Sequence, residues 1–297
     1  MGQYQRLLLI VEPDLHPSAA MRRACALARA SGAVLRLCVF VQPPPRTHLW
    51  GAKNDEVTIQ GYLHRYRRWM VEEATMLREE GLQVDTEVVW TTHPLLDILR
   101  HVEQFKPDLL IKDVTFEPLL KRVFITPLDC HLLRECTVPV LLVNQAEHGL
   151  PRRVVAAVDP SDPHASALNE RIVQTATMLA GQCDAALHLL YACDLSPAVN
   201  GDTALLAGAW DDEFADDLRE SLHMAFINLA ERCGVPAERR HFILGLPVPV
   251  IHEFVDEIEA DVMVMGTAHR VGLERLIGST TERALYALPG SLLAVRG

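Results

Sequence analysis

Lysine is absent from the whole second half of this 297-residue sequence, because its four lysines all lie in the first half: Lys53, Lys106, Lys112 and Lys121. A P-loop places a lysine against nucleotide phosphates, so no such loop exists after residue 150. Positive charge is also scarce overall, with 28 Lys+Arg against 39 Asp+Glu and a net charge of −11. This balance disfavours a broad contact with a phosphate backbone, and we expect no nucleic-acid partner.

Several chemical signatures are missing as well. The seven cysteines form no C-x-x-C pair, and most lie inside apolar runs, as is typical of reduced, buried thiols. There is no G-x-S-x-G elbow, and His252-Glu253 lacks the second histidine of a zinc protease. The chain is therefore not expected to be an enzyme. Its first apolar run, Leu7–Val11, is too short for a signal peptide or a membrane span, so a cytoplasmic protein is expected.

The sequence contains an internal repeat. Apolar runs at 7–11 and 34–41 flank a helix-like stretch at 17–30, and runs at 153–158 and 185–192 flank another at 165–180. The segment KPDLLIK, which begins at Lys106, aligns with EADVMVM, which begins at Glu259. Short aliphatic runs that alternate with amphipathic stretches are typical of βαβ units and a parallel sheet.

We therefore expect an α/β protein with two tandem Rossmann-like domains, 1–147 and 151–297, each a five-stranded parallel sheet flanked by helices. Expected strands lie near 6–11, 34–41, 84–90, 108–112, 139–143, 153–158, 185–192, 239–243, 261–265 and 291–295. The short polar linker at 144–151 predicts that the two copies pack as an intrachain pseudo-dimer. Whether the chain also forms a homodimer stays open.

The segment 59–77 has apolar residues at three- and four-residue intervals, which predicts an amphipathic helix. Its other face carries His64, Arg65, Arg67 and Arg68, interleaved with aromatic residues. A nucleic-acid interface and a solvent-exposed helix face are both compatible with this pattern. Glutamates such as Glu72 follow at once and offer partners one turn away, which favours the solvent-exposed face.

Candidate site residues lie after the strands of the second copy. Open α/β sheets bind ligands at the carboxyl ends of their strands, close to the point where strand order reverses. Asp159 ends the first strand there and would accept a hydrogen bond from a ribose hydroxyl. The loop after the fourth strand contains glycines, and Gly278-Ser279-Thr280 enters the last helix, whose free N–H groups favour phosphate.

These residues resemble the universal stress protein family in its tandem, E-type form. Members have an aspartate after the first strand and a G-x2-G-x9-G-[ST] loop after the fourth, which holds ATP in the binding members. The segment 125–134 (ITPLDCHLLR) is similar to the E-type signature, and the resemblance covers essentially the whole chain. It implies a role in stress response, with ATP and Mg²⁺ bound by the second copy and at most weakly hydrolysed. The implied binding residues are Asp159, Ala192, Met265, Gly266, His269, Gly278, Ser279 and Thr280.

The chain departs from the family pattern in both copies. His269 stands in place of the second glycine, and the loop between Gly266 and Gly278 is one residue shorter. In the first copy Asp113 replaces the first glycine and Glu12 replaces the aspartate. The first copy is therefore not expected to bind a nucleotide in the family's manner.

Each candidate residue also has a purely structural interpretation. Ser279-x-x-Glu282 is a capping box, Asp159-Pro160-Ser161-Asp162 is a turn and helix cap, and Gly266 would permit a tight turn between strand and loop. If these residues have only structural roles, the alternative function is that of a nucleotide-independent binding protein for a lipid-like small molecule or a protein partner.

Overall fold

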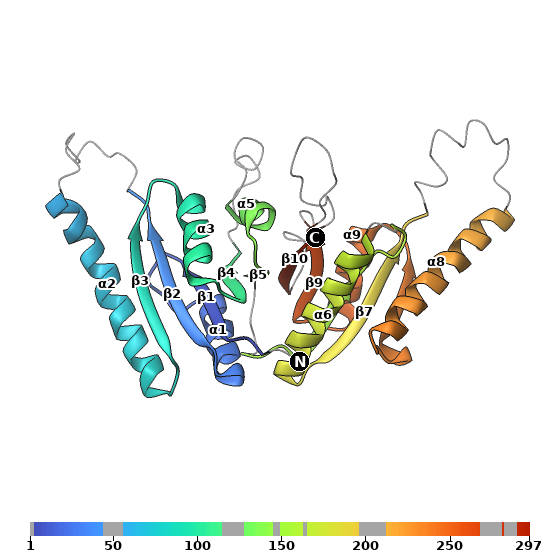
Figure 1. Cartoon of the computed structure of the whole chain (residues 1–297), viewed down its shortest axis with the longest axis horizontal. Helices are drawn as coiled ribbons and strands as arrows, with labels where there is room; N and C mark the ends of the chain where they lie inside the picture. Colours follow the sequence, from blue (N-terminus) through green and yellow to red (C-terminus); the bar gives the residue numbers. More distant parts are fainter. Residues whose placement is uncertain are drawn as a thin grey trace. The chain divides into compact units, whose positions relative to one another are not determined.

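A computed structural model describes residues 3–43, 56–114, 128–144, 149–162, 165–195, 212–267, 281 and 290–297. The chain divides into two compact units, Met1–Leu150 (unit 1) and Pro151–Gly297 (unit 2). Figure 1 shows that each unit is built from a twisted sheet with helices against it. In the part of the chain that is described, no helix is both long and apolar enough to cross a membrane.

Unit 1 is a five-stranded parallel sheet with the strand order β3-β2-β1-β4-β5. Each strand predicted from the sequence of this unit is confirmed, with its ends within one residue. The described elements are β1 (Arg6–Val11), α1 (Ala19–Ser31), β2 (Val34–Val41), α2 (Glu56–Glu79), β3 (Val84–Trp90), α3 (Pro94–Phe105), β4 (Leu109–Asp113), α5 (Leu128–Glu135) and β5 (Val140–Val143).

Unit 2 repeats this arrangement, with the parallel strand order β8-β7-β6-β9-β10. Its five strands also match the predicted ones, here within two residues. The described elements are β6 (Arg153–Ala157), α6 (Ser166–Cys183), β7 (Ala186–Cys193), α8 (Asp212–Arg232), the short 3-10 helix η3 (Ala237–Arg239), β8 (Arg240–Leu244), α9 (Pro247–Glu257), β9 (Val262–Thr267) and β10 (Ser291–Arg296).

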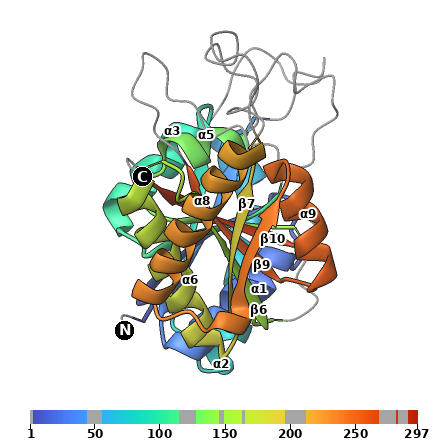
Figure 2. The same ribbon diagram turned by 90° about the vertical axis from the view of Figure 1, so that its right-hand side faces the viewer.

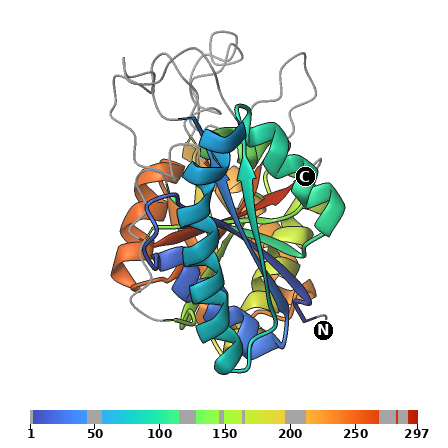
Figure 3. The ribbon, with the colours of Figure 1, turned by 90° about the vertical axis from the view of Figure 1, so that its left-hand side faces the viewer.

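Helices cover both faces of each sheet. Right-handed crossovers place α1 and α2 on one face of unit 1 and α3 and α5 on the other, and Figure 3 shows α2 lying along β2 and β3. In unit 2 the same rule places α6 and α8 together on one face, as Figure 2 shows, and α9 on the other. The central strands are thus buried on both sides, which explains why β1 is almost entirely aliphatic.

The duplication extends to single hydrogen bonds. The Oδ2 atom of Asp108 accepts from the backbone N–H groups of Gln5 and Arg6, at 2.7 and 2.9 Å. Asp261 accepts in the same way from Arg152 and Arg153, at 2.7 and 3.0 Å. Two residues before each aspartate the chain adopts a left-handed turn without glycine, with φ of 49° at Lys106 and 47° at Glu259. In each copy an equivalent aspartate therefore connects the start of the fourth strand to the start of the first.

The helix α2 is amphipathic, as its sequence predicts. Leu63, Met70 and Ala74 are buried against the sheet, whereas the basic face is exposed. Arg68 forms the expected ion pair with Glu72 one turn later, at 2.8 Å. These contacts support the interpretation of this face as solvent-exposed.

All seven cysteines are free thiols, five of them buried, as predicted from their positions in apolar runs. Burial raises the pKa of Cys25 to about 11 and that of Cys38 to about 12. Because the thiolate is the reactive form, these two side chains behave as inert core residues.

Candidate functional site

The order of strands reverses next to β6 in unit 2. From β6 the chain continues to β7 and β8 on one side, then returns to β9 and β10 on the other. The registers pair Ala157 with Leu190 of β7, and Ala156 with Val264 of β9. Two residues beyond Ala157, Leu190 and Val264, respectively, lie Asp159, Ala192 and Gly266. These three residues therefore lie at the same edge of the sheet. This edge is where open α/β sheets bind their ligands.

Four of the eight predicted site residues lie within the described residues. Met265 is buried in β9, Gly266 follows it, Ala192 is half-buried near the end of β7, and Asp159 is exposed. The other four lie outside the described residues: His269, Gly278, Ser279 and Thr280. The binding role of all eight stays a prediction.

Asp159 is part of a turn that is tied to helix α6. Its Oδ1 atom accepts from the Ser161 N–H at 3.0 Å and also from the Ser161 hydroxyl. Its backbone N–H donates to Oδ1 of the buried Asn169 at 3.0 Å, and Nδ2 of Asn169 donates to the Asp159 carbonyl at 2.7 Å. Within the described ranges, Oδ2 of Asp159 has no hydrogen-bond partner. The predicted turn is present, and it leaves one carboxylate oxygen for a ligand.

Gly266 is explained by packing rather than by an unusual backbone angle. The tight turn suggested by the sequence is wrong, because Gly266 lies inside β9 and is not among the residues with positive φ. A Cβ atom there would lie 2.7 Å from Cδ2 and 2.9 Å from Cγ of Leu168 on α6. Glycine at this position therefore allows the start of α6 to approach the end of β9.

Two further residues at this edge escaped the sequence analysis. The hydroxyl of the buried Thr281 donates to the Gly266 carbonyl at 2.9 Å and so fixes the end of β9. Tyr191 of β7 is buried, and its ring packs against Phe226 of α8 and Phe242 of β8. Burial raises the pKa of the Tyr191 phenol, so this hydroxyl stays protonated at neutral pH. Only the alignment of the two copies would have drawn attention to Tyr191, since its counterpart in unit 1 is a valine.

The same edge of unit 1 holds a buried ion cluster. The Lys112 ammonium lies 2.7 Å from Oε1 of Glu12 and 3.2 Å from Oδ1 of Asp129, and it donates to the Asp113 carbonyl at 2.8 Å. Lys112 and Asp129 are almost fully buried. Burial alone would lower the lysine pKa, but the Asp129 and Glu12 carboxylates outweigh it and raise the pKa.

In the strand of unit 2 that corresponds to β4, uncharged residues replace Lys112 and Asp113. Lys112 pairs with Ile10 of β1, and Met265 holds the corresponding place beside β6. Asp113, the counterpart of Gly266, accepts from the Ala20 N–H at 2.9 Å and so caps the start of α1. From the sequence, Asp113 could be recognised as the replacement for the first glycine, but the ion cluster around Lys112 could not be predicted.

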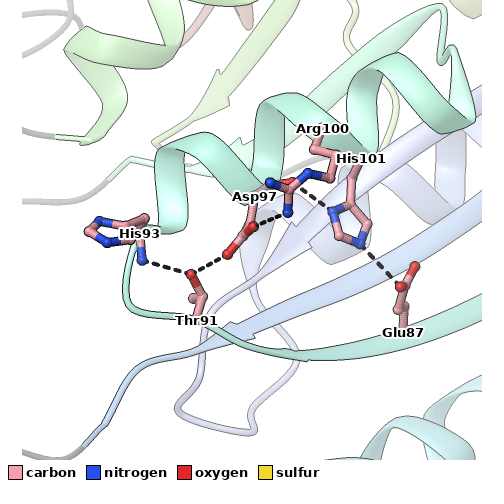
Figure 4. Close-up of polar contacts among 6 residues, drawn as sticks. All are labelled: Glu87, Thr91, His93, Asp97, Arg100 and His101. Carbon is pink, nitrogen blue, oxygen red and sulfur yellow. Dashed lines mark hydrogen bonds and ion pairs between the residues drawn. The ribbon is translucent and has the colours of Figure 1, made fainter.

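A second polar network of unit 1 joins β3 to α3 (Figure 4). Thr91 donates to Oδ2 of Asp97 at 2.6 Å and accepts from the His93 N–H at 2.9 Å, so the end of β3 is tied to the first turn of α3. His101 lies 2.6 Å from the Asp97 carbonyl through Nδ1 and 3.1 Å from Glu87 through Nε2. Both of these acceptors are satisfied when both ring nitrogens carry protons. The network fastens a helix to an edge strand, and it lies two strands away from the reversal point.

Unit 2 carries a histidine pair on its outer strands. Nδ1 of His188 lies 3.0 Å from Nε2 of His241, and the two rings are stacked. Partial burial lowers the pKa of both, and the charges of His241, Arg239 and Arg153 lower that of His188 further, whereas Glu257 acts in the opposite direction on His241. Among the described residues, no three His, Cys, Asp or Glu side chains are grouped so as to hold a metal ion.

Comparison with known proteins agrees with this architecture. The model of the Universal stress protein family matches residues 3–144 and again residues 151–296. Universal stress protein E of Escherichia coli (strain K12) is 27% identical over 303 residues, which cover 100% of this chain and 95% of that protein. The Universal stress protein E homolog of Haemophilus influenzae is 24% identical over 305 residues, or 99% of this chain and 98% of that protein.

Solved structures give the same result. A functionally unknown protein from Pseudomonas aeruginosa PAO1 superposes with a TM-score of 0.74 at 25% identity, covering 99% of this chain and 92% of that one. A universal stress protein from Archaeoglobus fulgidus shares the fold, with a TM-score of 0.69 at 16% identity and coverage of 98% and 96%. With both halves matched by the family model and E-type relatives aligned over its full length, the chain belongs to the universal stress protein family and carries two family domains in tandem, as the E-type members do.

Proposed function

We propose that this chain is a cytoplasmic stress-response protein whose unit 2 binds one adenine nucleotide, with Mg²⁺, at the carboxyl ends of β6, β7 and β9. The observation that carries the proposal is the difference between the two units at that edge. Unit 1 fills it with an ion cluster of the buried Lys112 and Asp129 and the half-buried Glu12. Unit 2 has Met265 and Gly266 in the corresponding strand and leaves the Asp159 carboxylate at the surface.

The residues of unit 2 fit an adenine nucleotide in a specific way. Asp159 offers a carboxylate oxygen to a ribose hydroxyl, a charge-assisted hydrogen bond of the stronger kind. Phosphate would be held by the backbone N–H groups and dipole of the helix that the sequence predicts after Gly278 rather than by a lysine, because this half of the chain has none. Residues 151–297 contain 11 Lys+Arg against 21 Asp+Glu, so a divalent cation would be needed to offset repulsion of the phosphates.

We further propose that binding, not catalysis, is the function of this site, with hydrolysis of ATP at most weak. The sequence offers no nucleophile elbow and no zinc-protease pair. Two of the titratable side chains described near Asp159 are Tyr191 and Cys193, and burial raises the pKa of both. Neither is therefore poised as a base or a nucleophile at neutral pH.

Isothermal titration calorimetry of the full chain with ATP and Mg²⁺ tests the proposal. We expect a stoichiometry of one nucleotide per chain and weaker binding without Mg²⁺. The informative variant is Asp159→Asn, because its amide oxygen can still accept from Ser161 while the charge is lost. Its affinity should fall about tenfold or more, as expected for a hydrogen bond to a charged group. The substitution Gly266→Asp is less informative, because its side chain would clash with Leu168 and disturb folding.

The matched control is Asp14→Asn in unit 1. Asp14 is exposed and accepts from the His16 N–H at 3.2 Å, so the same change is made in a similar turn. This variant should bind the nucleotide as the native chain does. Absence of binding heat and of thermal stabilisation in the native chain would refute the proposal.

A second candidate function is nucleotide-independent binding of a lipid-like molecule. One observation favours it: Leu244 and Leu246, at the carboxyl end of β8, are 49% and 57% exposed. A fluorescent fatty acid would then bind the native chain, lose affinity in Leu246→Ser, and not compete with ATP. Competition with ATP, or equal binding by the variant, would argue against this second function.

A further inference from the structure

We infer that the exposed face of α2 is a homodimer interface, in which two copies of the chain pack their α2 helices side by side in antiparallel directions. This surface belongs to unit 1, whereas the proposed nucleotide site belongs to unit 2. The basic residues of α2 were compatible with both a nucleic-acid interface and a solvent-exposed face, and the charges and exposure of the helix favour a second copy of this chain.

The exposed face of α2 carries one continuous stripe of polar side chains. Arg65, Arg68, Glu72, Thr75 and Glu79 follow one another at intervals of three and four residues, and all five are exposed. Residues at this spacing lie one above the other on the same side of a helix. Figure 3 shows α2 along the outside of the sheet, and its apolar side is buried against that sheet, so the stripe faces away from the core.

The charges of this stripe are divided between the two halves of the helix. The first half is basic, with Arg65 and Arg68, and the second half is acidic, with Glu72 and Glu79. Acidic residues stabilise the start of a helix and basic residues its end, so Glu79, the last residue of α2, opposes the helix dipole. The stability of the single helix therefore does not account for this order of charges.

Antiparallel packing of two such helices brings opposite charges together. Arg68 and Glu79 are eleven residues apart, which is close to three full turns, so they lie on one line along the helix. A two-fold axis midway between them places Arg68 of each copy opposite Glu79 of the other. The same axis places Glu72 opposite Thr75. In this register the stripe is complementary to itself, as the interface of a two-fold symmetric dimer must be.

The side chains of this face remain accessible in the single chain. Arg68 forms an ion pair with Glu72 on its own helix, yet the two side chains are still 74% and 55% exposed. Val71 and Met76 flank the stripe and are 57% and 51% exposed. Exposed ion pairs contribute little by themselves, so partial burial of these two apolar side chains would add to the stability of the dimer.

The corresponding helix of unit 2 lacks this pattern. Exposed acidic residues of α8 include Asp216, Asp217 and Glu220 in its first half and Glu231 near its end. Two antiparallel α8 helices would bring some of these acidic residues toward one another. The charge order of α2 is therefore a property of this helix and not a requirement of the shared fold.

Nucleic acid fits the face of α2 less well than a second copy does. Glu72 and Glu79 lie in the same stripe as the arginines, and the whole chain has a net charge of −11. A single helix pair is smaller than a permanent interface. We therefore expect a weak, reversible dimer that is sensitive to salt.

The test is analytical ultracentrifugation of the full chain at low and high salt, combined with single charge reversals. The native chain should dimerise at about 50 mM NaCl and dissociate toward monomers at about 500 mM, because salt screens exposed charges. Arg68→Glu and Glu79→Arg, each alone, place like charges opposite each other at both symmetric contacts. Each should raise the dissociation constant of the dimer about tenfold or more.

A mixture of the two variants separates a direct contact from a loss of helix stability. When an Arg68→Glu chain meets a Glu79→Arg chain, both contacts again pair opposite charges, so the mixture should form a heterodimer about as stable as the native dimer. A chain with both substitutions should dimerise with itself for the same reason. The matched control is Glu220→Arg on the exposed face of α8, which should leave the dissociation constant unchanged.

The inference would be overturned by a native chain that stays monomeric at about 50 mM NaCl, by a dimer that neither reversal weakens, or by mixed variants that stay monomeric. A monomeric native chain that binds a DNA duplex in the same experiment, and binds it less tightly as Arg68→Glu, would assign the basic half of α2 to nucleic acid instead. These measurements need no nucleotide, so their failure would leave the proposed function of unit 2 intact.

Discussion

Replacement of Lys112 tests most directly how the ion cluster at the carboxyl ends of the strands stabilises unit 1. The substitution Lys112→Met introduces the residue that unit 2 has at the corresponding position, Met265. It removes the only cation in the described cluster with Glu12 and Asp129. The Asp129 side chain is 0% exposed, so its charge cannot be hydrated once the lysine is gone. Loss of one partner from a buried ion pair typically costs about 3–5 kcal/mol, and we expect unit 1 to lose stability by that amount.

A second substitution should restore most of this loss. In Lys112→Met with Asp129→Leu both buried charges are gone, and Glu12, 33% exposed, can be hydrated. Buried ion pairs replaced by apolar groups of similar volume are often neutral or stabilising. The double variant is therefore expected within about 1 kcal/mol of the native chain. Lys106→Met is the control, since Lys106 is exposed and surface changes usually stay within about 0.5 kcal/mol.

Hydrogen exchange in increasing urea is the suitable assay, because a chain with two units need not unfold in one step. Protection of the amides of β1 and β4 reports on unit 1, and protection of β6 and β9 serves as an internal reference. A single variant as stable as the native chain would refute the reasoning. A double variant less stable than the single one would refute it too, because Asp129 would then not be the destabilising charge.

Two further predictions concern unit 2. The pKa values of His188 and His241 are lowered in the folded state, so folding favours the neutral form of both side chains. The free energy of unfolding is therefore highest above the ordinary pKa of 6.5, and it decreases as the pH falls from 6.5 toward the lowered pKa of the folded state. Thermal melts between pH 7.5 and 5 should show this loss and should show less of it in His188→Gln, and an equal loss in the variant would contradict the assignment. In Gly266→Ala the added Cβ meets Leu168 and should cost about 1–3 kcal/mol, as overpacking does. Urea unfolding should detect this cost, and Leu168→Ala in the same chain should reduce it; no rescue would mean that another contact requires the glycine.

The fold could be predicted from the sequence because its signals are local. Strands such as β1 are continuous aliphatic runs, and a run of that kind is required where a parallel strand is buried on both faces. The copies share Asp108 and Asp261, which tie the first strand to the fourth in each unit. A repeated sequence segment therefore corresponded to a repeated set of hydrogen bonds.

The site was only partly predictable because its contacts are not local. Lys112 reads as one polar residue at the end of an apolar strand, and its partner Glu12 lies 100 residues away in the sequence. Several explanations of Gly266 are compatible with the sequence. Only the structure shows that the glycine leaves room for Leu168 of a distant helix. Tyr191 is recognisable as a core aromatic residue, but no sequence pattern shows that it packs against Phe226 and Phe242. In each case the strand could be predicted from the sequence, but the partner was set by packing.

The two units share the contacts that stabilise the sheet and differ at the carboxyl ends of its strands. The shared carboxylates and the aliphatic strands preserve the fold in both copies, so each strand edge was free to change without loss of the sheet. In unit 1 this edge carries a lysine, and a buried lysine is stable only beside carboxylates, which Glu12 and Asp129 supply. Once those three charges satisfy one another, a nucleotide phosphate would have to displace a carboxylate already paired with the lysine. Under the proposed function, one nucleotide per chain is therefore expected, because the ion cluster occupies the corresponding edge of unit 1.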